Sequence, residues 1–388
     1  MASLNSADYM TFVREIRDIC DVHERFLPLH APLLDGKEKA YVLDAIDSTF
    51  VSSVGEYVAR FEEDLCRATG AGHVIACSNG TAALQVALHL AGVGQGDLVL
   101  TQALSFVATA NAIAHCGAEP VFLDVSEGDI GLSPDAVRSF VEKECTVLSN
   151  ECRHKASGKR VAACVPMHTF GLPCRIAELA GLCAEWRIAL VEDAAEALGS
   201  SYHKKHCGTF GLLGTLSFNG NKIVTTGGGG AIMTDDPDLA RRAKHLTTTA
   251  KLPHAWEYRH DDVAWNYRLP NLNAALGCAQ LERLEYFLSA KRARAKAYED
   301  LFSGTEWSFI CEKDHCYSNY WLCAVLTRNI EERDAFLRLA NEAGVMTRPA
   351  WESLHRLPMY SHCLHDTLAV TEDVVARLVN LPSGLGKG

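Results

Sequence analysis

The chain has 388 residues, of which 48% are hydrophobic and 22% charged, a balance typical of a globular protein and not of a disordered or fibrous one. A formal net charge of -11 disfavours nonspecific binding to nucleic acids or anionic membranes, because such binding requires basic patches. The sequence contains no apolar stretch of the length that spans a bilayer. We therefore expect neither a nucleic acid nor a membrane as a partner.

The fifteen cysteines predict buried thiols instead of disulfides or a metal site. Their number is odd, no paired CxxC spacing for zinc occurs, and the first residues lack the apolar run of a secretory signal. Several lie inside apolar runs, where a free cysteine behaves as a small hydrophobic residue: Cys77, Cys164, Cys183 and Cys278. We expect a reducing cytoplasm and no bound metal.

The first two thirds of the chain alternates short apolar runs with amphipathic segments, which predicts β-α-β units. The apolar runs, which read as buried strands, cover residues 73–79, 97–101, 119–125, 160–167, 188–193, 214–219 and 230–234. The amphipathic segments, which read as helices, include residues 81–93, 133–143 and 174–186. Because the runs are almost continuously apolar, we expect a mostly parallel sheet with helices on both faces.

The last third has a different pattern, which predicts a smaller α+β domain. A long helical pattern over 269–302 leads into short apolar runs and one further helix, at 307–310, 319–326, 330–344 and 345–349. We accordingly divide the chain into an N-terminal flank, a large cofactor-binding domain and a small C-terminal domain, with the bounds 1–26, 27–268 and 269–388.

The ends of the predicted strands are the places to look for chemistry, because ligands of open α/β sheets collect beyond the carboxyl ends of the strands. The first such end passes through Gly80 and Thr81 into a helix. Free backbone N–H groups and the helix dipole make such a turn a seat for phosphate. A plain N-capped helix with a glycine turn is the alternative, and for this turn taken alone it is the commoner case.

Two further strand ends carry a carboxylate and an amine. Asp193 closes an apolar strand and would gain from a buried cationic partner such as a protonated pyridine nitrogen, although a helix cap is an equal alternative. Lys222 lies between a short strand and a run of four glycines, which suits an imine-forming amine, although a solvated loop lysine is the commoner fate. Phe106, at the start of another helix, either stacks on a flat cofactor or packs in the core.

These features gain weight from their order along the chain. A phosphate turn, an aromatic residue, a carboxylate after a buried strand and then a lysine before glycines match the needs of one aldehyde-bearing pyridine phosphate. The combination favours pyridoxal 5'-phosphate as the cofactor.

Several phrases also resemble the DegT/StrS sugar-nucleotide aminotransferases, a family of the aspartate-aminotransferase fold type (fold type I). They are SNGTAAL, EPVFLDV, LVEDAAEALGS, SFNGNK and NYRLPNLNAALG, and the resemblance covers nearly the whole chain from about Phe26. Three more phrases are similar to the LegC-like branch of that family: FVSSVG, PMHTFG and FNGNKIVTTGGGG.

The resemblance implies a role for each matching residue. Lys222 would be the Schiff-base lysine and proton carrier, and Asp193 the partner of the pyridine nitrogen. Glu196 stands where the family often has Gln or His in contact with the cofactor's phenolic oxygen, and a carboxylate there would have to share a proton with that oxygen. The presence of Lys222 favours transamination, because relatives with His in its place catalyse dehydration.

The remaining contacts of the cofactor are implied in the same way. Gly80, Thr81 and Ser217 would hold the phosphate, and Phe106 would stack on the ring. Because family members build each active site from two subunits, the resemblance implies a homodimer. The residues that would reach the neighbour's phosphate or substrate are Asn266 and Arg268.

The implied reaction moves an amino group from glutamate to the C4 ketone of a nucleotide-linked 4-keto-6-deoxy-N-acetylhexosamine, on a route to nonulosonic acids or bacillosamine-type sugars. The substrate's diphosphate needs cationic or N–H donors, for which the candidates are His30, Arg268 and Arg348, each otherwise an ordinary surface or paired residue. Two alternatives are another reaction on the same cofactor, such as dehydration, elimination or decarboxylation, and a noncatalytic regulator that binds a sugar nucleotide.

Overall fold

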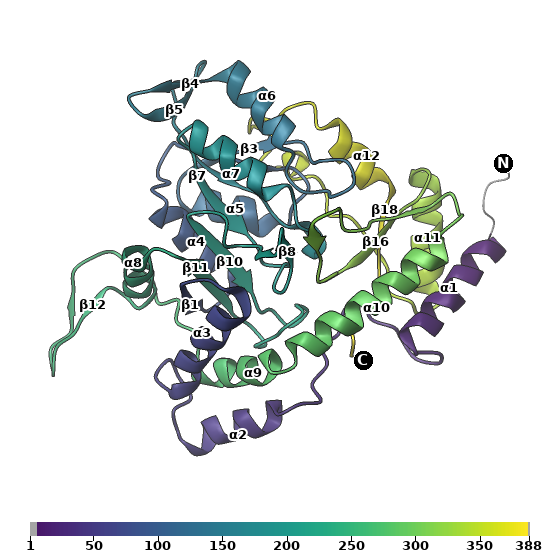
Figure 1. Cartoon of the computed structure of the whole chain (residues 1–388), viewed down its shortest axis with the longest axis horizontal. Helices are drawn as coiled ribbons and strands as arrows, with labels where there is room; N and C mark the ends of the chain where they lie inside the picture. Colours follow the sequence, from purple (N-terminus) through teal and green to yellow (C-terminus); the bar gives the residue numbers. More distant parts are fainter. Residues whose placement is uncertain (1–5, 387–388) are drawn as a thin grey trace.

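The computed structural model describes residues 6–386. Their centre is a seven-stranded sheet (Figure 1). From one edge to the other the strands are β1 (His73–Cys77), β11 (Gly230–Thr234), β10 (Leu213–Ser217), β7 (Ala189–Asp193), β6 (Val161–Val165), β2 (Leu98–Gln102) and β3 (Glu119–Leu123). Strand β11 is antiparallel to both of its neighbours, and the remaining pairs are parallel. The seven apolar runs thus form one mostly parallel sheet, and the predicted α/β class is confirmed.

Helices cover both faces of this sheet, as the alternation along β1 shows. Val74 and Ala76 point into one apolar cluster, and Ile75 and Cys77 point into another on the opposite face. On the first face lie α3 (Glu56–Thr69), α6 (Pro134–Glu144), α7 (Ile176–Glu185) and α9 (Asn271–Leu281). On the second face lie α4 (Gly80–Leu90), α5 (Val107–His115) and α8 (Pro237–Thr247).

A second layer follows the sheet in the chain and has α+β character. Its four-stranded antiparallel sheet consists of β14 (Ser308–Phe309), β16 (Cys323–Leu326), β18 (Leu378–Leu381) and β17 (Arg348–Pro349). Its helices are α10 (Leu284–Phe302), α11 (Ile330–Glu342) and α12 (Ala369–Arg377). The strands and the helix expected after residue 302 are therefore present.

The N-terminal flank contributes a helix, α1 (Ser6–Cys20), to this second layer (Figure 1). The ring of Phe12 lies 5.3 Å from that of Phe302 and 5.1 Å from that of Trp307, centroid to centroid. Aromatic contacts of this kind join the flank to the core formed by α10 and α11. The division of the chain into domains at residues 26 and 268 stays a prediction.

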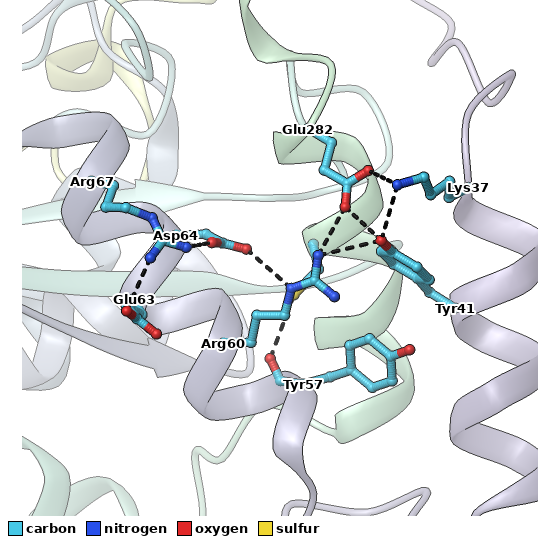
Figure 2. A network of polar contacts seen from close by, with 9 residues as sticks. Lys37, Tyr41, Tyr57, Arg60, Glu63, Asp64, Arg67 and Glu282 are labelled. Carbon is cyan, nitrogen blue, oxygen red and sulfur yellow. Dashed lines mark hydrogen bonds and ion pairs between the residues drawn. The ribbon is translucent and has the colours of Figure 1, made fainter.

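The long helical pattern over 269–302 is interrupted, because α9 ends at Leu281 and α10 begins at Leu284. At the interruption Glu282 joins a charged network with α2 (Glu38–Asp47) and α3 (Figure 2). Its carboxylate accepts hydrogen bonds from the Tyr41 hydroxyl at 2.5 Å and from Arg60 at 2.8 Å, and Lys37 lies 2.9 Å away. The network thus connects α2 to α3 and to the junction between α9 and α10.

Several shorter elements complete the chain. They are the hairpin β4 (Cys145–Leu148) and β5 (Glu151–His154), the small sheet of β8 (Ser201–Tyr202), β9 (Lys205–His206) and β15 (Cys316–Tyr317), and the two turns Thr169–Gly171 and Leu354–Arg356. The pair β12 (Lys251–Leu252) and β13 (Arg259–His260) forms an arm that projects away from the body (Figure 1). Across residues 6–386, no helix combines the length and apolar character that crossing a membrane requires.

Candidate active site

A cavity of about 330 Å³ opens at the carboxyl ends of the parallel strands, where the sequence predicted the chemistry. Seven of the predicted site residues line it: Gly80, Thr81, Phe106, Asp193, Glu196, Ser217 and Lys222. They lie at the ends of β7 and β10 or in the segments that follow β1, β2, β7 and β10. The tertiary structure thus brings together residues that are spread over more than a third of the sequence.

The turn between β1 and α4 forms one wall of this cavity. The side chain of Asn79 caps the helix by accepting a hydrogen bond from the Ala82 N–H at 2.8 Å, which leaves the first two N–H groups, of Gly80 and Thr81, without a partner in the described chain. A Cβ atom on Gly80 would lie 2.9 Å from that of Ser217, so glycine permits the turn to approach β10 closely. The helix cap and the phosphate seat are therefore compatible.

Asp193 lies at the end of β7 with its carboxylate buried. One carboxylate oxygen accepts a hydrogen bond from the Thr109 hydroxyl at 2.8 Å, and the other from the Ala195 N–H at 3.2 Å. Burial raises the pKa of Asp193, and these two donors oppose that shift. A cationic ring nitrogen placed beside this carboxylate would offset the cost of burying its charge.

Lys222 extends into the cavity between a carboxylate and an aromatic face. Its Nζ atom lies 3.1 Å from Oε1 of Glu196 and 3.8 Å from the centre of the Trp321 ring. The other oxygen of Glu196 accepts a hydrogen bond from the Phe170 N–H at 2.9 Å. Burial raises the pKa of Glu196 to about 7, against the opposing effect of the Lys222 charge.

Two aromatic side chains, Phe106 and Trp351, form another part of the wall. Phe106 is the residue before α5, its side chain is 49% exposed, and its ring lies 6.0 Å from that of Trp351. A large apolar ring that stays half exposed at the mouth of a cavity is available to a ligand, whereas a core residue is not. The exposure of Phe106 favours the predicted stacking role over core packing.

A second cavity, of about 470 Å³, adjoins the first, and the two share Asn221, Trp321 and Trp351. It is lined by two of the predicted substrate residues, His30 and Arg348. The shared residues place the two cavities side by side.

Asn266 and Arg268 line neither of these two cavities. Both residues are exposed, and Nε of Arg268 donates a hydrogen bond to the Asn266 side chain at 2.8 Å. They lie where the arm rejoins the body, and the chain there pairs with the end of β1 through Cys77. Their predicted action on a neighbouring subunit stays a prediction.

Sequence reasoning missed several residues that complete the site. The largest are Trp321 and Trp351, which come from the second layer of the fold, and Thr109 on α5 supports Asp193. A hydroxyl one turn after Phe106 was a usable signal for Thr109, because α5 starts at the same strand edge. Nothing in the local sequence marks Trp321, because its position depends on how the second layer packs on the sheet.

The residues of the first cavity suit pyridoxal phosphate. Two free N–H groups and the Ser217 hydroxyl match a phosphate, the buried Asp193 matches a ring cation, and the Lys222 amine matches an aldehyde carbon.

Across the described range 6–386, no cluster of three or more His, Cys, Asp or Glu side chains has the arrangement of a metal site. All fifteen cysteines are free, including the buried Cys77, Cys164, Cys183 and Cys278.

Comparisons with known proteins point to one family of aminotransferases. The model of the DegT/DnrJ/EryC1/StrS aminotransferase family matches residues 32–386. The chain is 35% identical over 359 residues to GDP-perosamine synthase of Escherichia coli O157:H7, covering 92% of this chain and 93% of that protein. It is 32% identical over 374 residues to dTDP-4-dehydro-2,3,6-trideoxy-D-glucose 4-aminotransferase of Saccharopolyspora spinosa, covering 91% of each. The crystal structure of the aminotransferase TlmJ from Streptoalloteichus hindustanus superposes with a TM-score of 0.83 at 30% identity, covering 92% of this chain and 93% of that one.

Proposed function

Because the chain belongs to the DegT/DnrJ/EryC1/StrS aminotransferase family, we propose that it transfers an amino group from glutamate to the C4 ketone of a nucleotide-linked 4-keto-6-deoxy-N-acetylhexosamine. The observation that carries this proposal is the position of Lys222, whose amine shares one cavity with a phosphate seat and a buried carboxylate. The product would serve a route to nonulosonic acids or bacillosamine-type sugars.

The first cavity would hold pyridoxal phosphate through this chain's own donors and acceptors. Gly80, Thr81 and Ser217 would bind the phosphate, and Phe106 would stack on the ring. Asp193 would keep a proton on the ring nitrogen, and the Thr109 hydroxyl would hold the Asp193 carboxylate in place. The cofactor, when bound, supplies the carbonyl group that exchanges nitrogen with the substrates and the electron sink that stabilises a carbanion.

Lys222 would move the proton in both halves of the reaction. As a free amine it would take a proton from the carbon of glutamate that carries the nitrogen in the first half, and would give a proton to C4 of the sugar in the second. Trp321 and Glu196 limit where Nζ can lie, because one covers a face of the amine and the other binds it. A proton carrier held in this way stays within reach of both carbon atoms.

The second cavity would take the nucleotide part of the substrate. His30 and Arg348 provide an imidazole and a guanidinium on its wall, both of which suit a diphosphate. The name of the S. spinosa relative states a nucleotide-linked 4-keto sugar and a 4-aminotransferase, which supports amination at C4. The N-acetylhexosamine rests on the LegC-like phrases, from which we also expect UDP as its nucleotide. The name of the E. coli relative, in contrast, states a GDP-linked product.

We also propose a homodimer in which each active site contains residues of both subunits. The loop after α2 and the arm expose large apolar side chains, among them Trp256, Tyr258 and Val263 with exposed fractions of 79%, 82% and 90%. Surfaces of this kind usually become buried against a partner. Asn266 and Arg268 stand at the base of that arm, outside their own subunit's cavities. They would reach the cofactor phosphate or the substrate of the neighbouring subunit.

The purified protein tests these proposals directly. Bound cofactor should give visible absorbance that glutamate removes and a UDP-linked 4-keto-6-deoxy-N-acetylglucosamine restores, with one 2-oxoglutarate formed for each amino sugar. A faster reaction with the GDP-linked 4-keto-6-deoxy sugar would change the assigned nucleotide and leave the transaminase assignment intact.

Other outcomes would favour the alternatives. Loss of water or carbon dioxide without 2-oxoglutarate would indicate another reaction on the same cofactor. Binding of the sugar nucleotide by a protein without visible absorbance would indicate a regulator.

A further inference from the structure

Lys291 is a buried lysine to which the reaction described above gives no role. It lies on α10, and its side chain is only 2% exposed. Its Nζ atom lies 3.1 Å from Nε2 of His30, 3.1 Å from the Trp321 carbonyl oxygen and 2.7 Å from the Ser383 carbonyl oxygen. One side chain therefore joins three segments that are far apart in the sequence.

Two of these three partners line the first or the second cavity. His30 lines the second cavity, and Trp321 lines both and covers Nζ of Lys222 with its ring. The indole N–H of Trp321 is also occupied, since it donates to the Asn221 carbonyl oxygen at 2.7 Å. Trp321 is thus held through its backbone carbonyl by Lys291 and through its indole N–H by Asn221, the residue next to Lys222.

The contact with Lys291 also determines where His30 carries its proton. Burial and the neighbouring charge of Lys291 keep the pKa of His30 well below its usual value, so the imidazole is neutral and has a single N–H. An ammonium group has three donors and no acceptor, so Nε2 must present its lone pair to Lys291. The proton then lies on Nδ1, which is covered and has no hydrogen-bond partner among the described residues.

An unpaired buried N–H is unfavourable unless something supplies an acceptor. The second cavity, which His30 lines, is the place from which an acceptor can come. In the proposed reaction the ligand of that cavity carries a diphosphate, whose oxygen atoms are strong acceptors.

We propose, on the basis of the function proposed above, that Lys291 is a positioning residue of the substrate site. Its ammonium holds Trp321 over Lys222 and fixes His30 as the tautomer with the proton on Nδ1. His30 thereby offers an N–H donor to a diphosphate oxygen of the nucleotide sugar.

The surroundings of Lys291 are consistent with this role. Burial lowers the pKa of Lys291 to about 7, so its ammonium form predominates below this pH, and the groups around it are the thiols of Cys20 and Cys323 and the charge of Arg294. Burying an ammonium is unfavourable unless hydrogen bonds satisfy its protons. A lysine at this position is explained by its three hydrogen bonds.

The test is nitrogen NMR of the histidines in the cofactor-free protein, with His30→Gln to identify the signal of His30. At pH 6 the unmodified protein should show the proton of His30 on Nδ1, and adding UDP or GDP should shift that signal. In Lys291→Met, His30 should be a mixture of the two tautomers. Calorimetry should show that this variant binds the same nucleotide about tenfold more weakly. Lys296→Met is the matched control, because Lys296 lies on the same helix, is exposed and pairs with Glu299 and Asp300.

The outcomes separate the two proposals. A His30 proton on Nε2 in the unmodified protein would overturn the inference, and this measurement does not depend on how Lys291→Met folds. The inference would also fail if neither nucleotide bound or shifted the His30 signal, or if Lys291→Met bound nucleotide normally. None of these results concerns amino transfer, whereas absence of 2-oxoglutarate with every keto sugar would reject the proposed reaction and leave the tautomer unchanged.

Discussion

The Nζ atom of Lys222 lies 3.1 Å from Oε1 of Glu196, and in the described part of the chain no other cation forms an ion pair with this carboxylate. Glu196 is almost completely buried, and Trp321 covers the opposite side of the amine. The lysine and the carboxylate therefore depend on each other for charge compensation, and a change at either residue affects both.

Glu196→Gln should change how the stability of the cofactor-free protein depends on pH. Burial raises the pKa of Glu196 from 4.5 to about 7, so between these values the native state binds a proton that the unfolded state has lost. The free energy of unfolding should therefore fall as the pH rises through this range, by about 1.4 kcal/mol per pKa unit. Glu196→Gln should remove this fall. Denaturant titrations at pH 5 to 8 test it, and parallel curves for the two proteins would contradict it.

Lys222→Ala should leave the fold intact and reduce transamination below detection, because no other side chain in the cavity provides an imine-forming amine. Borohydride reduction of the loaded unmodified protein followed by peptide mapping should place the cofactor label on Lys222. A label on a different lysine would contradict the assignment of Lys222 as the Schiff-base lysine. Circular dichroism of the variant is the control for folding.

Asp193→Asn should retain much of the bound cofactor and slow turnover by roughly a hundredfold or more, since a neutral amide cannot stabilise a charged ring nitrogen. Thr109→Val is the companion variant, because it removes only the hydroxyl that donates to Asp193 at 2.8 Å. We expect a smaller loss in Thr109→Val. Turnover at saturating cofactor is the measurement, and near-normal turnover in Asp193→Asn would show that the carboxylate is only structural.

Mixing Lys222→Ala chains with Arg268→Ala chains should restore part of the lost activity if the two residues serve one site from opposite subunits. Each chain alone should be inactive, and after subunit exchange a mixed dimer would contain one complete site. The position of Arg268, exposed and outside its own cavities, motivates the experiment. Subunit exchange is verified with differently tagged chains. Absence of recovery after exchange would place both residues in the same subunit's site or make Arg268 structural.

The sequence by itself determined the sheet and most of the first cavity. Seven apolar runs became the seven strands, because an almost continuously apolar run is a local feature that predicts a strand buried on both faces. Gly80, Asp193 and Lys222 could be placed at this cavity from the sequence, since each lies at or just after the carboxyl end of a strand, and these ends share one edge of the sheet. The resemblance to one family added the expected partners of these residues.

Only the tertiary structure decided which residues face Lys222 from outside the sheet. Trp321 reaches the amine because the second layer packs on the strand ends, and Lys291 meets His30 because α10 crosses the N-terminal segment. Contacts between residues this far apart in the chain depend on the packing of whole layers, which no local period encodes. The exposed positions of Asn266 and Arg268 have the same origin, because they depend on where the arm rejoins the body beside the end of β1.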